Sequence, residues 1–145
     1  MKIIPFEENY RDDLIFMILQ AKDALGRKPG LNKDLLDIKS NYFDKEGRFW
    51  IAIDENDRVI GSIGYVKVDG TNEAFIHRLF VKSAKKRKGI GTALLTQAEE
   101  CMKNNGILVS KVHLGTPKAD WYESYSFYLK HGYLEYEERY MRKLL

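Results

Sequence analysis

The sequence predicts an α/β fold in which a mixed sheet carries helices on its faces. Apolar residues recur at helical spacing in several stretches, and runs rich in β-branched and aromatic residues alternate with them. Glycine, proline, asparagine and aspartate separate these stretches. The length of 145 residues suits one core, so a single domain over residues 1–145 is expected.

The composition excludes several classes of protein. Hydrophobic residues make up 44% of the chain and charged residues 31%, as in an ordinary soluble globule. No apolar run is long enough to span a bilayer, and the first residues lack the pattern of a secretory signal. With a single cysteine, the chain can have no internal disulfide framework. These features predict a cytoplasmic protein with no membrane partner.

The N-terminal part is expected to hold a short strand at residues 2–6 and two helices. An apolar stripe predicts the first helix, which Gly26 ends, and the pair Pro29-Gly30 predicts a turn. Asn32 is expected to cap the second helix, which runs to about Asn41. The inward positions are Tyr10, Leu14, Met17, Ile18, Ala21 and Leu25 in the first helix and Leu35, Leu36 and Ile38 in the second.

The middle of the chain predicts three strands. Residues 49–53 and 59–68 have strand composition and form a hairpin around an acidic turn. Gly61 and Gly64 weaken the second arm and are expected to mark bulges. After another turn, residues 73–81 form the next strand.

The C-terminal part predicts two helices and at least two strands. Residues 89–105 form the most strongly amphipathic helix, with Ile90, Leu94, Ala98 and Cys101 on one face, and a strand follows at residues 107–114. Asp120 and Glu123 have the spacing of a capping box, which predicts a helix over 120–131. The tail, residues 133–145, has strand-like composition with room for an extra strand. Crossovers through both helices should give parallel strand neighbours.

A basic, glycine-containing turn joins the strand ending at Val81 to the helix that follows. Five of the seven residues from Lys82 to Lys88 are basic, and without these five the net charge of +3 becomes −2. A helix N-terminus offers unpaired amide hydrogens and partial positive charge, and glycines let its backbone approach a ligand closely. The turn therefore predicts a phosphate or pyrophosphate site. Such a local cluster favours one anionic ligand over nucleic acid or a membrane.

The segment Lys86-Arg87-Lys88-Gly89-Ile90-Gly91 resembles the acyl-CoA signature Gln/Arg-x-x-Gly-x-Gly/Ala of the GNAT superfamily of acetyl-CoA-dependent N-acetyltransferases, with Lys86 at the Gln/Arg position. The resemblance implies a mixed, mostly antiparallel sheet of six to seven strands flanked by about four helices. It also implies a splayed parallel strand pair that holds acetyl-CoA as cosubstrate. The residues implied to bind acyl-CoA are Leu79, Phe80, Val81, Lys86, Arg87, Lys88, Gly89, Ile90, Gly91 and Thr92.

A second segment, Phe127 to Tyr133, resembles the family's Phe-Tyr-x-x-x-Gly-Phe motif. The resemblance implies that Tyr128 lies beside the thioester sulfur and protonates the departing thiolate. A phenol suits this role because its ordinary pKa is about 10, so it keeps its proton at pH 7. From the residues alone, Tyr128 would instead be a core aromatic on one helical stripe with Tyr125 and Trp121.

The general base is left open by the sequence. Some members of the family carry a carboxylate at the position of Phe75, and that version is missing here. Glu73 and His77 lie on the same strand face as Phe75 because strand side chains alternate. Either could accept the proton of the amine, or water could relay it outward. No metal-ligand spacing links the three histidines, so no metal is expected.

The expected reaction is acetyl transfer to a primary amine of a small molecule or peptide. A non-catalytic acyl-CoA-binding or sensing domain is the alternative. A nucleic-acid-binding module fits less well because the basic run is short and no recognition helix accompanies it. Arg78 is expected in a salt bridge or against a substrate carboxylate, and Glu135, Glu137 and Glu138 form a possible acidic rim. The tail strand could pair with a second copy, so a homodimer is possible.

Overall fold

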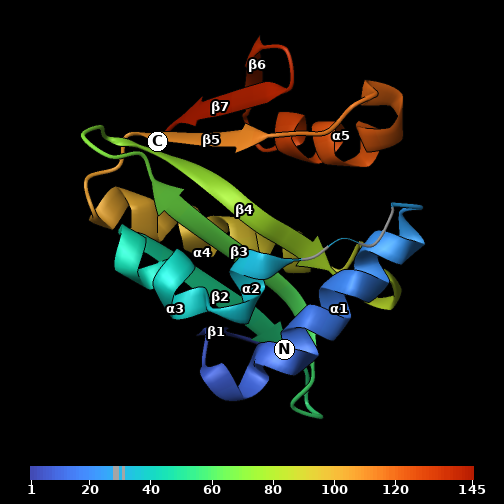
Figure 1. The fold of residues 1–145 in the computed structure, drawn as a ribbon. Helices are drawn as coiled ribbons and strands as arrows, with labels where there is room; N and C mark the ends of the chain where they lie inside the picture. Colours follow the sequence, from blue (N-terminus) through green and yellow to red (C-terminus); the bar gives the residue numbers. More distant parts are fainter. Residues whose placement is uncertain (28–29, 31) are drawn as a thin grey trace. The chain divides into compact units, whose positions relative to one another are not determined.

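The structure is a computed structural model that describes residues 1–27, 30 and 32–145. Pro29 of the predicted turn lies outside the described residues. The sheet has seven strands in the order β1-β2-β3-β4-β5-β7-β6, which confirms a mixed, mostly antiparallel sheet (Figure 1). The strands are β1 (Lys2–Pro5), β2 (Gly47–Ile53), β3 (Val59–Lys67), β4 (Glu73–Val81), β5 (Val109–His113), β6 (Leu134–Glu137) and β7 (Tyr140–Leu144).

Five α-helices occur in the described part of the chain, along with short 3-10 turns. They are α1 (Arg11–Ala24), α2 (Lys33–Leu36), α3 (Ile38–Asn41), α4 (Ile90–Asn104) and α5 (Tyr122–Lys130). The chain divides into two compact units. Unit 1 comprises residues 1–66 and 77–98, and unit 2 comprises residues 67–76 and 99–145. Both β4 and α4 run through the two units.

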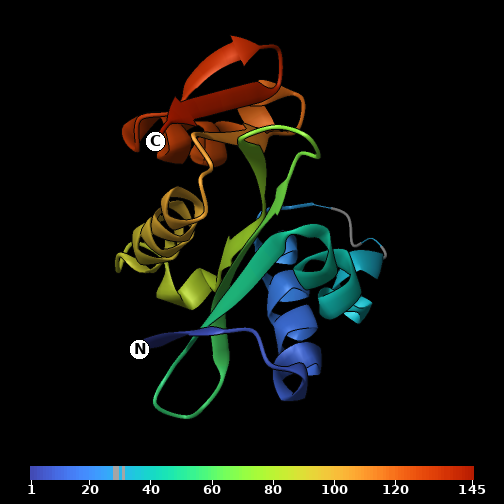
Figure 2. The same cartoon turned by 90° about the vertical axis from the view of Figure 1, so that its left-hand side faces the viewer.

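Unit 1 has three layers. Strands β1, β2 and β3 and the end of β4 form its sheet; α1, α2 and α3 cover one face, and the first half of α4 covers the other (Figure 2). The core between the first three helices and β2 contains Leu14, Met17, Ile18, Leu35, Ile38, Tyr42, Phe49 and Ile51. The stripe predicted for the first helix therefore supplies this core at four of its positions, Leu14, Met17, Ile18 and Ala21.

The predicted second helix is wrong in detail. Residues 32–41 form two four-residue helices, α2 and α3, which Asp37 separates. Asn32 makes no side-chain cap, whereas the Asp37 carboxylate accepts a hydrogen bond from the Ser40 N–H at 3.0 Å and caps α3. Because the helix breaks at Asp37, Leu36 turns outward and is 58% exposed rather than buried.

The two glycines of β3 are sites of close packing. A Cβ at Gly61 would lie 2.9 Å from Leu94 Cδ1 and 3.2 Å from Ile90 Cγ2, so α4 lies directly on bare backbone there. The β2–β3 register does shift beside Gly61, as the predicted bulge requires. Gly64 lies in regular ladder opposite Phe49, so no bulge marks it.

Unit 2 contains the β5, β7 and β6 strands, the start of β4, and α5. Glu73–Phe75 of β4 pair in parallel with Val109–Lys111 of β5, as the first helical crossover predicts. The second predicted parallel neighbour is wrong, because β7 lies between β5 and β6 and pairs antiparallel with both. The capping box is also wrong: Asp120 lies inside a 3-10 turn (Lys118–Trp121), and α5 begins only at Tyr122.

None of the helices in the described residues is both long enough and apolar enough to cross a membrane.

Candidate active site

The turn between β4 and α4 belongs to unit 1 and curls tightly. After Val81 the chain makes a 3-10 turn (Ser83–Lys85), and then Arg87 and Gly89 adopt left-handed backbone conformations with φ of 64° and 80°. Successive amide groups of a tight turn can face one concave side, which is a common anion-binding geometry. The Gly89 carbonyl accepts the Ala93 N–H at 3.0 Å, so Gly89 occupies the N-cap of α4.

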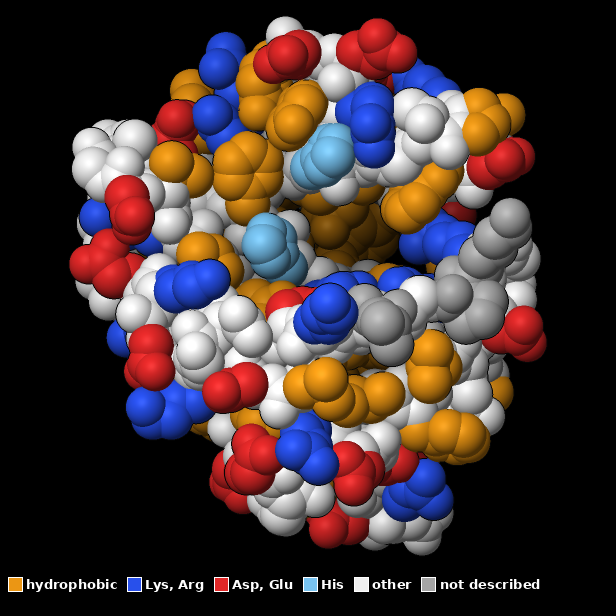
Figure 3. All heavy atoms as spheres, viewed as in Figure 1, with side chains coloured by type: hydrophobic (Ala, Val, Ile, Leu, Met, Phe, Trp, Pro, Cys, Tyr) orange, Lys and Arg blue, Asp and Glu red, His pale blue; other side chains and the backbone are white. Residues whose placement is uncertain are grey.

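Charge and space at this turn both suit an anion. Arg87, Lys88 and Gly89 are exposed, and Lys86 is half-buried. A Cβ on Gly89 would meet no atom within 4 Å, so glycine serves the left-handed conformation and not a tight contact. The helix dipole of α4 adds partial positive charge at the same point. Over the face shown in Figure 3, acidic and basic side chains are interspersed, so no broad basic surface is seen there.

Strand β4 leads into this turn. Its parallel register with β5 extends over Glu73–Phe75, and β4 then continues to Val81. Leu79, Phe80 and Val81 are half-buried and lie directly before the basic turn. These three predicted residues and the turn residues 86–92 all belong to unit 1.

His77 also belongs to unit 1. Its imidazole lies edge-on to the Tyr42 ring, with ring centroids 5.9 Å apart. Loss of hydration lowers the pKa of His77; nearby Asp34 opposes this shift and nearby Arg78 adds to it. The residue nevertheless remains exposed. A lowered pKa leaves the ring neutral at pH 7, the form that can accept a proton.

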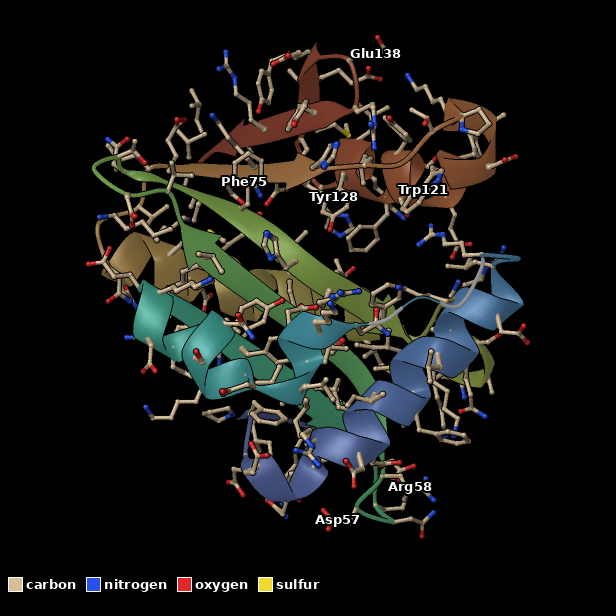
Figure 4. The ribbon with its side chains drawn as sticks, viewed as in Figure 1. Asp57, Arg58, Phe75, Trp121, Tyr128 and Glu138 are labelled. Atoms are coloured by element: carbon tan, nitrogen blue, oxygen red, sulfur yellow. The ribbon has the colours of Figure 1, made fainter. Side chains whose placement is uncertain are left out.

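Tyr128 lies on α5 of unit 2, and Trp121 lies in the turn before that helix (Figure 4). Tyr128 is only 5% exposed and packs edge-on against Tyr133, with ring centroids 5.2 Å apart. Burial raises the pKa of its phenol, and the Glu99 carboxylate raises it further. Tyr128 is therefore protonated throughout the physiological range, and its hydroxyl makes no hydrogen bond to any other residue that the structure describes.

Glu73, the second candidate base, is already engaged. It lies at the start of β4 in unit 2, and its Oε2 forms an ion pair with Lys111 Nζ at 2.9 Å. Both side chains are largely buried, at 27% and 17% exposure. Lys111 also lies over the Phe75 ring, at 5.8 Å from its centroid. Glu73 is thus held by an ion pair, whereas the contact described for His77 is with the Tyr42 ring.

Arg78, for which the sequence left open a salt bridge or a contact with a substrate carboxylate, forms an ion-pair network. Its Nη2 lies 2.6 Å from Asp34 Oδ1, and its Nη1 donates to Asn32 Oδ1 at 3.0 Å. Burial would raise the pKa of Asp34, but hydrogen bonds from Arg78 and Tyr42 outweigh it and lower that pKa. Asp34 and Arg78 are 44 residues apart in the chain, so no local signal could pair them.

Unit 1 also has a surface depression. It lies beside α1 and the β2–β3 turn and is lined by Asn9, Tyr10, Asp12, Asp13, Phe16, Asp57 and Arg58. Figure 4 labels Asp57 and Arg58 at that turn. Two of its carboxylates have structural partners: Asp57 accepts the Tyr10 hydroxyl at 2.6 Å, and Asp13 pairs with Arg58 at 2.7 Å.

Comparisons with known proteins identify the family of this chain. The family model described as "Acetyltransferase (GNAT) family" matches residues 15–133. An acetyltransferase of the GNAT family from Staphylococcus aureus Mu50 is 25% identical, with a TM-score of 0.89 over 99% of this chain and 98% of that one. No curated protein matches the chain significantly.

Two further solved structures contain coenzyme A. The PaiA N-acetyltransferase from Thermoplasma acidophilum is 21% identical, with a TM-score of 0.74 over 100% of both chains. An aminoglycoside 6'-N-acetyltransferase is 19% identical, with a TM-score of 0.70 over 99% of this chain and 97% of that one. Both were solved in complex with coenzyme A, and at these identities they show the shared fold.

Proposed function

Because the chain belongs to the acetyltransferase (GNAT) family, we propose that it moves the acetyl group of acetyl-CoA to a primary amine of a small molecule or peptide. The observation that carries the proposal is the curled, basic turn at the N-terminus of α4, where Arg87 and Gly89 adopt left-handed backbone conformations. We take residues 1–145, both units together, to be the working domain, and the cytoplasm to be its location.

Coenzyme A would bind along unit 1. Its pyrophosphate fits the amides and cations of the turn, residues Lys86 to Thr92, because a helix N-terminus stabilises phosphate oxygens. Its pantetheine arm fits the main chain of Leu79, Phe80 and Val81, since peptide-like amides pair with an extended strand. The two relatives solved with coenzyme A support this choice of ligand. No group of metal-ligating side chains occurs among the described residues.

The amine must lose a proton before it attacks the thioester. An alkyl amine has a pKa near 10.4, so restoring its neutral form at pH 7 costs about 4–5 kcal/mol. His77 is the better candidate base, because its pKa is lowered and its ring is exposed. Glu73 is the weaker candidate, because Lys111 holds its carboxylate. Relay by water is the third route.

The thiolate must gain a proton as it leaves. The Tyr128 hydroxyl is the proposed donor, since burial and the Glu99 carboxylate keep it protonated. General acid catalysis contributes about 10²–10⁴-fold to rate. Amide donors aimed at the developing oxyanion supply the remaining stabilisation.

The test combines the protein, acetyl-CoA and a panel of primary amines, and follows the free thiol that is released. Tyr128→Phe should lower kcat by about 10²-fold or more while leaving KM for acetyl-CoA nearly unchanged. Tyr125→Phe is the matched control, because Tyr125 is also a buried tyrosine of α5 and should retain activity.

Two results would overturn the proposal in different ways. If calorimetry detects coenzyme A binding but no amine is acetylated, the protein is an acyl-CoA-binding domain without activity. If coenzyme A does not bind at all, the family's ligand is not the ligand of this chain.

A further inference from the structure

Arg78 has an unusual backbone for a strand residue. Its φ of 57° is left-handed, a conformation that disfavours every residue with a Cβ. The other described non-glycine residues with positive φ, which lie in turns or next to them, are Glu46, Asp57, Arg87 and Arg139. Among the described residues, Arg78 is therefore the one residue inside a strand whose backbone is left-handed.

The ladder between β3 and β4 contains one extra residue on β4. Lys82 N–H donates to the Ile60 carbonyl at 2.8 Å, and Val68 N–H donates to the Glu73 carbonyl at 2.9 Å. Ile60 and Val68 are eight residues apart, whereas Glu73 and Lys82 are nine apart. One β4 residue between these two bonds consequently lacks an opposite partner, which defines a β-bulge. The left-handed φ places the bulge at Arg78.

Both the backbone and the side chain of Arg78 are held. Its carbonyl accepts the Ser62 hydroxyl at 2.7 Å, and Ser62 is completely buried on β3. Its guanidinium makes a bidentate contact with Asp34, in which Nε donates to Oδ2 at 3.0 Å and Nη2 donates to Oδ1 at 2.6 Å. Bidentate pairs of this kind fix orientation as well as distance.

Asp34 is in turn held by a buried aromatic residue. The Tyr42 hydroxyl donates to Asp34 Oδ2 at 2.6 Å. Tyr42 is 1% exposed and packs edge-on against Phe49, with ring centroids 4.9 Å apart. Since α2 has only four residues, this contact gives Asp34 a position that so short a helix does not secure.

We propose that Ser62, Asp34 and Tyr42 are positioning residues that hold Arg78 in its left-handed conformation. We call these contacts the Arg78 clamp. The main chain of Leu79, Phe80 and Val81 begins directly after Arg78, so the bulge decides which edge each amide and carbonyl of this segment faces. Without the clamp, Arg78 relaxes toward ordinary β conformation, and the main-chain groups proposed to bind the pantetheine arm then point in other directions. This inference rests on the proposed function.

The decisive comparison is Arg78→Ala against Arg78→Gly in the full chain. Both variants lose the guanidinium, but only glycine adopts positive φ at little cost. Arg78→Ala should lower kcat/KM for acetyl-CoA about tenfold, equivalent to about 1.4 kcal/mol, and Arg78→Gly should stay within about threefold of the wild type. Arg139→Ala and Arg139→Gly are matched controls at a left-handed arginine in the β6–β7 turn, and neither should change kcat/KM.

A second pair covers the case in which Arg78→Ala fails to fold. Ser62→Ala should weaken coenzyme A binding in calorimetry, and adding Arg78→Gly to it should restore the affinity. Ser110→Ala is the matched control, because Ser110 is equally buried and loses a 2.7 Å hydrogen bond with Tyr133. It should lower thermal stability without altering the affinity for coenzyme A.

The outcomes separate this inference from the proposed function. Arg78→Ala and Arg78→Gly could lose kcat/KM equally, through a raised KM for the amine. That result would mean that the guanidinium itself contacts the acceptor, and it would overturn the clamp. Equal and undiminished activity of both would overturn it as well. A wild-type protein that binds no coenzyme A would overturn the proposed function first, and the clamp with it.

Discussion

Gly89 illustrates how a single residue serves the candidate site through its backbone. Its φ is 80°, and a Cβ at this position would touch nothing. Any effect of a side chain there therefore acts through conformation, and a non-glycine residue at positive φ costs about 1–2 kcal/mol.

We expect Gly89→Ala to lower the free energy of unfolding by about 1 kcal/mol and to weaken coenzyme A binding, because the amides of the turn move. Gly106→Ala is the control at the opposite end of α4, with φ of 77° and an equally open Cβ position. It should cost similar stability and leave the affinity unchanged. Calorimetry and urea unfolding measure both quantities, and equal affinities in the two variants would count against a phosphate site at this turn.

The Asp34 carboxylate predicts a pH dependence of stability. Burial acts to raise its pKa, but hydrogen bonds from Arg78 and Tyr42 lower it overall. A depressed folded-state pKa stabilises the protein above the unfolded pKa of about 3.9, and this contribution is lost as pH falls through the folded value.

We therefore expect wild type to exceed Asp34→Asn in free energy of unfolding by about 1–3 kcal/mol at pH 7, and the difference to shrink below pH 4. Urea unfolding at a series of pH values measures this difference. A gap between the two proteins that stays constant from pH 7 to pH 3 would show that ionisation of Asp34 contributes nothing.

Among the elements, the region of α2 and α3 shows what helical periodicity misses. Apolar residues at 35, 36 and 38 fit one continuous helix, yet the chain breaks at Asp37. The Asp37 side chain competes for the backbone by accepting the Ser40 N–H, and Asn32 is drawn to Lys22 and Arg78 and caps nothing.

We expect Asp37→Ala to lower the free energy of unfolding by about 1 kcal/mol, the usual cost of losing an N-cap. Asp44→Ala removes a surface ion pair with Lys39, at 3.2 Å, and should cost less than about 0.5 kcal/mol. Chemical unfolding of the two variants decides the matter, and equal losses would mean that Asp37 does not cap α3.

At the scale of the whole molecule, local patterns predict elements better than they predict neighbours. The sequence predicts β4 with its exact ends and α4 to within one residue, because alternation and helical spacing are local signals. It misplaces the final strands, because β7 pairs with both β5 and β6 and nothing local encodes that insertion.

In the candidate site too, local sequence predicts some parts and misses others. Glycines and cations beside each other in the chain predict the basic turn, whereas Tyr128 gains a role only through family resemblance. The Arg78 clamp escapes prediction because Asp34 and Tyr42 come from segments remote in sequence, and the left-handed φ of Arg78 has no sequence signature.

The continuity of β4 and α4 through both units predicts cooperative unfolding. The two tryptophans report on the units separately, since Trp50 belongs to unit 1 and Trp121 to unit 2. In Trp50→Phe and Trp121→Phe, the remaining fluorescence should follow the same denaturant midpoint as far-UV circular dichroism of that variant. Midpoints that differ between the two probes would show that the units unfold independently.

The bare backbone at Gly61 has a consequence for ligand binding that reaches beyond packing. Ile90 and Leu94, which rest on it, lie in the first two turns of α4, the helix that begins at the proposed anion site. A Cβ at Gly61 would push Ile90 and Leu94 away from the sheet and would therefore move the first amides of α4. If the proposed cosubstrate binds at these amides, a substitution at Gly61 in the hydrophobic interior should change its affinity.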